Sequence, residues 1–224
     1  MATTDGTATL VLVRHATTPA TGRRLGGWTP GVDLDEAGVS QAQATAARLQ
    51  DVPVRAVYAS PLERTQQTAR ILARPHRLRV RTRQGLGEID YGRWTDQPLG
   101  RLRRRALWRV VQHTPSRVTF PGGESIRQAQ ARAVDLTEEL AAAHRGEVIV
   151  CVTHADVIKA VVAHHLAMPL DAFQRLVVDP ASATALQLPA EGPPSLRCFN
   201  DVGGIAATLP WRTAETASGG GAPT

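Results

Sequence analysis

Short apolar, β-rich runs alternate with amphipathic segments along most of this 224-residue chain. An apolar run of about four to eight residues between turn residues is typical of a strand buried on both faces of a parallel sheet. The strands expected on this basis are Thr7–Val13, Val54–Ala59, Leu78–Thr82, Glu147–Val152, Arg175–Val178, Thr184–Leu188 and Leu196–Phe199, the last two as a hairpin. The alternation predicts an α/β fold, a three-layer sandwich with a mostly parallel central sheet and helices on both faces.

The segments between these strands carry helix signals. Asp35 is expected to cap a helix that runs to Gln50, and Pro61 to open a helix that ends at Ala73, because the missing N–H of proline costs nothing in a first turn. Further helices are expected over Leu102–Val111, Glu124–His144 and Asp156–Leu166, and loops over 16–32, 84–100 and 113–123.

The chain length suits one domain, which we expect over residues 1–202, followed by a disordered tail at 203–224 that is rich in small residues and proline. No apolar run approaches the roughly 18 residues that a membrane helix needs, and Leu10–Val13 is too short for a signal peptide. Cys151 and Cys198 have neither a metal-site nor a disulfide-framework pattern. These features favour a cytoplasmic protein without a membrane partner and leave a homodimer open.

The chain is basic, with a net charge of +6 and a pI near 10.5. A pI above about 9 raises nucleic-acid binding as an alternative, and five arginines cluster in one segment: Arg101, Arg103, Arg104, Arg105 and Arg109. Few aromatic residues interleave with this cluster, and no recognition motif is visible. A solvated helix face that packs Leu102, Leu107 and Trp108 inward is therefore favoured, and a nucleic-acid-binding module is the distant alternative.

Two histidines occupy matching positions, each directly after a buried apolar strand. His15 follows the first strand through Arg14, and His154 follows Glu147–Val152 through Thr153. Functional sites of open α/β sheets form at the carboxyl ends of strands, so we expect both imidazoles in one cleft. A single such histidine would more simply bond a backbone carbonyl, but the matched pair beside Arg14 favours a site.

An arginine and an acid complete this candidate site. Arg64 lies one turn into the helix after the second strand, against the preference of the helix dipole. A guanidinium binds phosphate through two hydrogen bonds, so two arginines that converge on two histidines predict an oxyanion pocket. Glu88, in a glycine-flanked loop, could protonate a leaving group, with Asp90 as the alternative.

Five ordered segments together resemble the histidine phosphatase superfamily, which has the phosphoglycerate-mutase-like fold. Leu12–Ala16 is similar to the Arg-His-Gly signature of that family, and Ser60–Thr68 to its Ser-Pro-x-x-Arg-x-x-x-Thr segment. Gly87–Trp94 resembles the acid loop, Phe120–Ser125 the Pro-Gly-Gly-Glu-Ser turn, and Val152–Ala155 the second histidine motif. The resemblance covers roughly residues 9 to 190 and extends to an actinobacterial branch labelled probable phosphomutases.

The resemblance implies a two-step phosphoryl transfer that needs no metal and no cofactor. His15 would become a phosphohistidine, Arg14, Arg64 and His154 would hold the phosphoryl oxygens, and Glu88 would be the proton donor. It also implies a cap insertion at about 93–121 and a set of substrate-binding residues, namely Thr21, Ala155, Tyr91 and Arg93.

The chain departs from the family pattern at three positions near the site. Ala16 and Ala155 replace the usual glycines after each histidine, which fits if neither position needs a positive φ. Thr21 stands where the family often has an asparagine that contacts phosphate. A hydroxyl can donate only one hydrogen bond, so we expect a weaker phosphate contact there.

The acid loop separates two activities. Mutases of this family carry Glu-Arg-His-Tyr-Gly at the position where this chain has Glu88 followed by Ile89-Asp90-Tyr91-Gly92. This variant favours hydrolysis of a small phosphomonoester by a phosphatase, and a phosphomutase is the alternative. The intact set of catalytic residues argues against an inactive relative.

The other histidines are expected to take no part in the chemistry. His76, His113 and His144 are expected to be solvated. His164 and His165, adjacent on a helix, are expected to point in different directions and to make surface or oligomer contacts. The sequence thus predicts no metal site.

Overall fold

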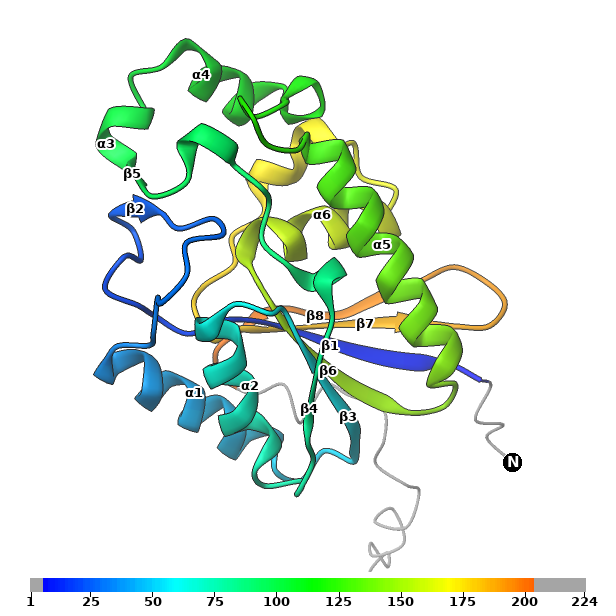
Figure 1. The fold of residues 1–224 in the computed structure, drawn as a ribbon. Coiled ribbons are helices and arrows are strands. Elements are labelled where there is room, and N and C mark those ends of the chain that lie inside the picture. The colour runs from blue at the N-terminus through cyan, green and yellow to red at the C-terminus, as the bar shows by residue number, and fades with distance from the viewer. Residues whose placement is uncertain (1–5, 204–224) are drawn as a thin grey trace, which may run out of the picture.

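The computed structural model describes residues 6–203, so the expected tail lies outside the described residues apart from Gly203. A six-stranded sheet runs through the molecule in the order β4-β3-β6-β1-β7-β8 (Figure 1). Its strands are β1 (Ala8–Arg14), β3 (Val54–Ala59), β4 (Val80–Thr82), β6 (Val148–Thr153), β7 (Ala183–Leu188) and β8 (Ser195–Asp201). The first four strands in this order are parallel, and β7 and β8 continue the sheet as an antiparallel hairpin.

Helices cover both faces of this sheet (Figure 1). Helices α1 (Glu36–Leu49) and α2 (Glu63–Ala73) lie on one face, and α5 (Ile126–Ala143) and α6 (Ala155–His165) on the other. Alternate residues of β1 enter the two cores: Val11 and Val13 pack with α1 and α2, while Leu10 and Leu12 pack with α5 and α6. Burial on both faces explains the uninterrupted apolar strands, and the predicted three-layer α/β sandwich is confirmed.

The cap segment, residues 93–121, packs around a separate apolar cluster that includes Trp94, Leu102, Val111 and Phe120. The expected helix over Leu102–Val111 is broken into α3 (Leu99–Leu102) and α4 (Ala106–His113). Leu102 and Val111 are nine residues apart, so a continuous helix would turn them to opposite faces. The break between them lets both side chains enter the same cluster.

Other short elements lie in the expected loops. Strand β2 (Arg24–Leu25) pairs antiparallel with β5 (Gln97–Pro98), which brings two loops together beside the sheet. The expected loops at 84–100 and 113–123 also contain the 3-10 turns η1 (Gln84–Leu86), η2 (Gly92–Trp94) and η3 (Pro115–Arg117).

Several expected boundaries were wrong. Arg175–Val178 is not a strand: Arg175 ends the 3-10 helix η4 (Leu170–Arg175), and the carbonyl of Val178 accepts a hydrogen bond from Arg14 instead of a neighbouring strand. Helix α2 begins at Glu63 rather than at Pro61. Helix α5 begins at Ile126 because Ser125 and Gln128 form a capping box.

Asp35 caps α1 as predicted, through a hydrogen bond from the Gly38 N–H to its carboxylate. Within residues 6–203, the structure has no helix that is long and apolar enough to cross a membrane.

Candidate active site

The two histidines of the sequence motifs lie side by side at the carboxyl ends of neighbouring parallel strands. The register of β1 and β6 pairs Arg14 with Thr153, so the residue after each strand is a histidine at the same level. The ring centroids of His15 and His154 are 5.3 Å apart, with the ring planes at 63°. The expectation that the two imidazoles are neighbours is confirmed, but only His15 lines the cavity, so the expectation of both rings in one cleft is wrong for His154.

His15 is held as a neutral imidazole with one free nitrogen. Its Nδ1 lies 2.8 Å from the carbonyl oxygen of Ala16, which fixes the proton on Nδ1 and leaves the lone pair of Nε2 exposed. Burial lowers the pKa of His15 to about 3, and the charges of Arg64 and Arg14 add to this effect. A neutral imidazole oriented in this way is a competent nucleophile.

Two buried guanidinium groups line the same cavity as His15. Arg14 donates to the carbonyl of Val178 at 2.6 Å, and Arg64 donates to the carbonyl of Gly27 at 2.7 Å. Arg14 Nε and Arg64 Nη1 are nevertheless buried without a hydrogen-bond partner. Buried N–H groups of a cation without a partner are costly, so their presence beside a nucleophile points to a bound anion.

The motif that carries Arg64 also fixes the turn after His15. The Thr68 hydroxyl, one helical turn after Arg64, accepts a hydrogen bond from the Ala16 N–H at 3.1 Å. Neither Ala16 nor Ala155 has a positive φ, so alanine is accommodated at both positions without backbone strain.

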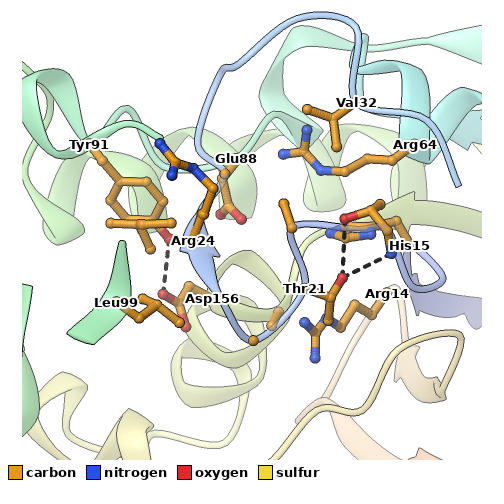
Figure 2. Close-up of a pocket in the computed structure, with 16 residues that line it drawn as sticks. Arg14, His15, Thr21, Arg24, Val32, Arg64, Glu88, Tyr91, Leu99 and Asp156 are labelled. Carbon is orange, nitrogen blue, oxygen red and sulfur yellow. Dashed lines mark hydrogen bonds between the residues drawn. The ribbon is translucent and has the colours of Figure 1, made fainter. Parts of the chain in front are cut away.

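The cavity in front of His15 has a volume of about 250 Å³ (Figure 2). Its wall comes from the end of β1, the loop before and after β2, the start of α2, the acid loop and the start of α6. The lining residues are Arg14, His15, Thr18, Ala20, Thr21, Gly22, Arg24, Leu25, Gly26, Val32, Arg64, Glu88, Tyr91, Leu99, Ala155 and Asp156.

His154 lies behind this cavity rather than in its wall. It is completely buried, its Nε2 lies 2.9 Å from the Ser60 hydroxyl, and its Nδ1 faces Arg64 at 3.5 Å and Glu88 at 3.6 Å. Burial, followed by the charge of Arg64, holds the pKa of His154 well below its usual value. The neutral ring of His154 therefore lies between the carboxyl group of Glu88 and the guanidinium group of Arg64.

Glu88 is the acid of the cavity. Burial and, after it, the negative charge of Asp156 raise the pKa of Glu88 to about 7, against the opposing effect of Arg64. A carboxyl group with this pKa holds its proton for a large part of the time at neutral pH and can donate it. The alternative acid, Asp90, does not line the cavity: its carboxylate accepts a hydrogen bond from the Gly92 N–H.

Arg132 of α5 holds the acid loop, and the sequence reasoning missed this residue. Its guanidinium donates to the carbonyl oxygens of Gly85, Gly87 and Glu88, each at 2.9 Å, and pairs with Glu124 at 2.6 Å. Trp28 Nε1 donates to the same Glu88 carbonyl at 2.7 Å. No feature of the sequence distinguishes Arg132 from the many other arginines of this chain.

Asp156 is a second residue that the sequence reasoning did not place in the site. It lines the cavity, and its carboxylate accepts a hydrogen bond from Tyr91 Oη at 3.1 Å (Figure 2). The same carboxylate accepts a hydrogen bond from Lys159 Nζ, also at 3.1 Å. Its position directly after the second histidine motif was the available signal. The cavity thus contains two acidic side chains, Glu88 and Asp156.

Three of the four expected substrate-binding residues line the cavity, namely Thr21, Tyr91 and Ala155. The Thr21 hydroxyl accepts a hydrogen bond from the Thr18 N–H at 2.9 Å and is thereby tied to its own turn. Arg93 lies elsewhere, in a cavity of about 310 Å³ that is lined by residues of the cap segment. The chain turns at Gly92, whose φ is +50°, and this turn separates Arg93 from Tyr91.

The remaining histidines differ in their surroundings. His113 is exposed, as expected. His144 is not free in solvent, because its Nε2 forms a hydrogen bond with the Tyr58 hydroxyl at 2.9 Å and its Nδ1 lies 2.6 Å from Glu147. His76 is partly buried, with its Nε2 enclosed.

Comparisons with known proteins agree with this geometry. The chain is 31% identical over 183 residues to phosphoserine phosphatase 1 of Hydrogenobacter thermophilus, covering 80% of this chain and 86% of that protein. It is 33% identical over 167 residues to a 2,3-bisphosphoglycerate-dependent phosphoglycerate mutase of Rhizobium johnstonii, covering 69% and 77%.

Its fold matches that of a mycobacterial glucosyl-3-phosphoglycerate phosphatase with a TM-score of 0.79 at 26% identity, covering 87% of this chain and 99% of that one. The family model of the histidine phosphatase superfamily (branch 1) matches residues 10–202. With that match spanning most of the sequence, the chain belongs to the histidine phosphatase superfamily.

Proposed function

We propose that this protein is a metal-independent phosphatase that hydrolyses small phosphomonoesters through a phosphohistidine at His15. One observation carries this proposal. A neutral histidine with a free Nε2, two buried guanidiniums with unpaired N–H groups and a carboxyl group with a pKa of about 7 surround one cavity. These are the nucleophile, the anion donors and the acid that phosphoryl transfer requires.

In the first step, the lone pair of His15 Nε2 attacks phosphorus, and the bond from phosphorus to the leaving oxygen breaks. Glu88 donates its proton to that oxygen, so the leaving group departs as an alcohol. Arg14 and Arg64 bind the phosphoryl oxygens and stabilise the charge that they carry in the transition state. His154 lies behind Arg64 and Glu88, at 3.5 Å and 3.6 Å, and supports the position of both side chains.

In the second step, a water molecule attacks the phosphohistidine. Glu88, now a carboxylate, accepts one proton of this water, and the bond between phosphorus and Nε2 breaks. Inorganic phosphate leaves, and both His15 and Glu88 return to their starting protonation states. We propose that the cap segment, residues 93–121, limits the size of the leaving group, since Leu99 lines the cavity.

The charges in the cavity favour hydrolysis over the mutase alternative. A phosphomutase must hold a second phosphate group, and that task needs further cations. The remaining arginine of the cavity, Arg24, pairs with Asp96 at 2.6 Å, while Glu88 and Asp156 add negative charge. Names of relatives such as phosphoserine phosphatase support a small phosphorylated metabolite as the substrate.

The experiment that tests this proposal is hydrolysis of p-nitrophenyl phosphate in the presence of EDTA. The wild-type protein should turn over, and quenching in alkali should trap an acid-labile phosphoryl group on one histidine. His15→Ala should lose both the activity and the trapped label, while His113→Ala, which changes an exposed histidine, should retain both. An active His15→Ala protein or an activity that EDTA abolishes would contradict the proposal.

Mutase activity is measured in parallel with 3-phosphoglycerate. Formation of 2-phosphoglycerate faster than release of inorganic phosphate would favour the alternative function on the same catalytic residues.

A further inference from the structure

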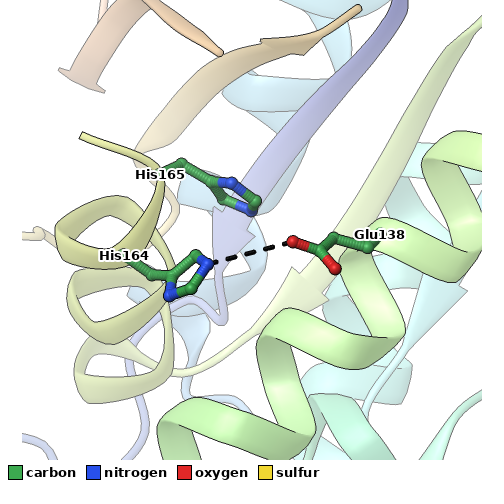
Figure 3. A group of neighbouring side chains, drawn as sticks. All are labelled: Glu138, His164 and His165. Atoms are coloured by element: carbon green, nitrogen blue, oxygen red, sulfur yellow. Dashed lines mark ion pairs between the residues drawn. The ribbon is translucent and has the colours of Figure 1, made fainter. Parts of the chain in front are cut away.

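Three side chains of metal-binding type converge outside the active site, between α5 and α6. Glu138, His164 and His165 each offer one ligand atom, and these atoms all lie within 4.8 Å of one another (Figure 3). The sequence predicted that the two adjacent histidines point in different directions. That prediction was wrong: at the C-terminal end of α6 their ring centroids are 5.2 Å apart, and both rings lie near Glu138.

The present contacts of these side chains leave their ligand atoms available. His165 Nε2 is buried and has no hydrogen-bond partner, which is a costly state for a polar atom. His164 Nε2 lies 3.9 Å from Glu138 Oε1, which is too long for a hydrogen bond.

We propose that Glu138, His164 and His165 bind one divalent transition-metal ion such as Zn²⁺, with water as the fourth ligand. Two imidazoles and one carboxylate are a ligand set that suits Zn²⁺, whereas Mg²⁺ and Ca²⁺ prefer oxygen ligands alone. Ligand atoms on one tetrahedral zinc ion lie about 3.3 Å apart, given bond lengths of about 2.0 Å. Glu138 and His164 are exposed, so their side chains are free to close the remaining distance.

The position of the site assigns it a structural role. The site joins α5, which carries Glu138, to the C-terminal end of α6. Helix α6 has 11 residues and therefore spans about 16 Å, with His154 preceding its first residue. The ion would thus be remote from the phosphate cavity and would crosslink two helices that cover the same face of the sheet.

The test is zinc binding by the untagged full-length protein, kept reduced and measured by calorimetry and by thermal unfolding. We expect one Zn²⁺ per chain and a Tm increase of about 5 °C when free Zn²⁺ exceeds its Kd about 100-fold. Mg²⁺ at the same concentration should leave the Tm unchanged. Substitution by Co²⁺ should give the visible absorption bands of a four-coordinate ion.

Matched variants locate the ion. Glu138→Gln and His164→Ala, both at exposed positions, should each weaken Zn²⁺ binding at least about tenfold. Glu139→Gln, on the same helix, and His113→Ala, on α4, should bind like the wild type. The same affinity in the ligand variants and in these controls would overturn the proposal. So would loss of binding in His15→Ala, since the ion would then occupy the phosphate cavity.

This outcome is independent of the phosphatase proposal. Hydrolysis of p-nitrophenyl phosphate should be the same in Glu138→Gln as in the wild type, because the site takes no part in the chemistry.

Discussion

At the level of single residues, the proposed chemistry depends on the protonation state that each buried group holds near neutral pH. His15 has a pKa of about 3 and Glu88 a pKa of about 7, although both are buried at the same cavity. Burial disfavours the charged form of each group, so it keeps the histidine neutral and the carboxyl group protonated. One physical cause thus prepares a nucleophile and an acid together.

The pKa of Glu88 predicts the pH dependence of the first step. Glu88 carries its proton below about pH 7, so kcat/KM for an alkyl phosphate should fall about tenfold per pH unit above that value. The second pKa of a phosphomonoester is about 6, so the substrate is mainly a dianion above about pH 7 and the decrease there reports the protein. Steady-state rates measured between about pH 6 and about pH 9 check this decrease.

Two comparisons check the assignment to Glu88. The decrease of kcat/KM above about pH 7 should disappear in Glu88→Gln. It should be weaker for p-nitrophenyl phosphate, because the leaving group of this substrate needs little protonation. An unchanged profile in Glu88→Gln would assign the proton transfer to another residue.

Asp156 should influence which phosphomonoesters the cavity accepts. Asp156→Asn removes one negative charge but leaves an amide oxygen that can accept from Tyr91. The kcat/KM for 3-phosphoglycerate relative to glycerol phosphate should rise about tenfold, because repulsion of the substrate carboxylate is removed. The alkaline decrease in rate should also move to lower pH, since Asp156 raises the pKa of Glu88.

The matched control for this substitution is Asp135→Asn, at an exposed position of α5. It should change neither the substrate ratio nor the pH profile. Equal ratios in the wild type and in Asp156→Asn would show that this carboxylate does not face the leaving group.

At the level of elements, the acid loop has little regular structure of its own and is held in place by hydrogen bonds and contacts from neighbouring elements. Arg132 on α5 binds three of its carbonyl groups, and Trp28 binds one. Gly123 of the following turn is also in close contact with it, since an added Cβ there would lie 2.1 Å from the Asp90 carbonyl oxygen. The position of Glu88 therefore depends on helix α5 and on the Pro-Gly-Gly turn.

Arg132→Lys should lower kcat about 10- to 100-fold, because an ammonium group cannot make the same set of directed hydrogen bonds. KM should change little, since Arg132 is absent from the cavity wall. Arg127→Lys, on the same helix, is the control. If Arg132 positions Glu88, the decrease of kcat/KM at alkaline pH should also shift in Arg132→Lys. A variant that is only less stable would keep the pH profile of the wild type.

The elements also show where sequence patterns were sufficient. Apolar runs identified the strands β1, β3 and β6, because a strand buried on both faces has no room for polar residues. The cap segment was harder to predict, since its broken helices follow from a local cluster around Trp94 and Phe120 that periodicity alone does not reveal. The segment Arg175–Val178 has a strand-like composition, but the pairing partner it would need is absent in the described structure.

At the level of the whole molecule, buried titratable groups link stability to pH. The unfolded chain protonates His15 and His154 below about pH 6.5, whereas the folded chain keeps both neutral, His15 down to about pH 3. Glu88 opposes them, because its pKa falls from about 7 in the folded chain to 4.5 on unfolding. Two histidines against one carboxyl group leave the unfolded chain with the greater proton uptake between about pH 4.5 and 6.5.

Stability should therefore rise with pH across that window. The free energy of unfolding in urea should be lower at pH 5 than at pH 7 by at least about 1 kcal/mol. Glu88→Gln removes the opposing group and should make the difference larger. An equal or higher stability at pH 5 would mean that the two histidines are not held neutral in the folded chain.

The sequence by itself determined the α/β class and the positions of most strands along the chain. It also identified five residues of the candidate site: Arg14, His15, Arg64, Glu88 and His154. Arg14, His15 and His154 lie at strand ends and Arg64 in the first turn of a helix, while Glu88 belongs to a recognisable loop motif, so local sequence patterns already indicate all five positions. Only the tertiary structure decided that Arg132 fastens the acid loop, that Asp156 faces the cavity, that Arg93 does not, and that Glu138 meets two histidines. These contacts join residues from separate elements, and their geometry depends on how helices pack and loops turn, which no local pattern records.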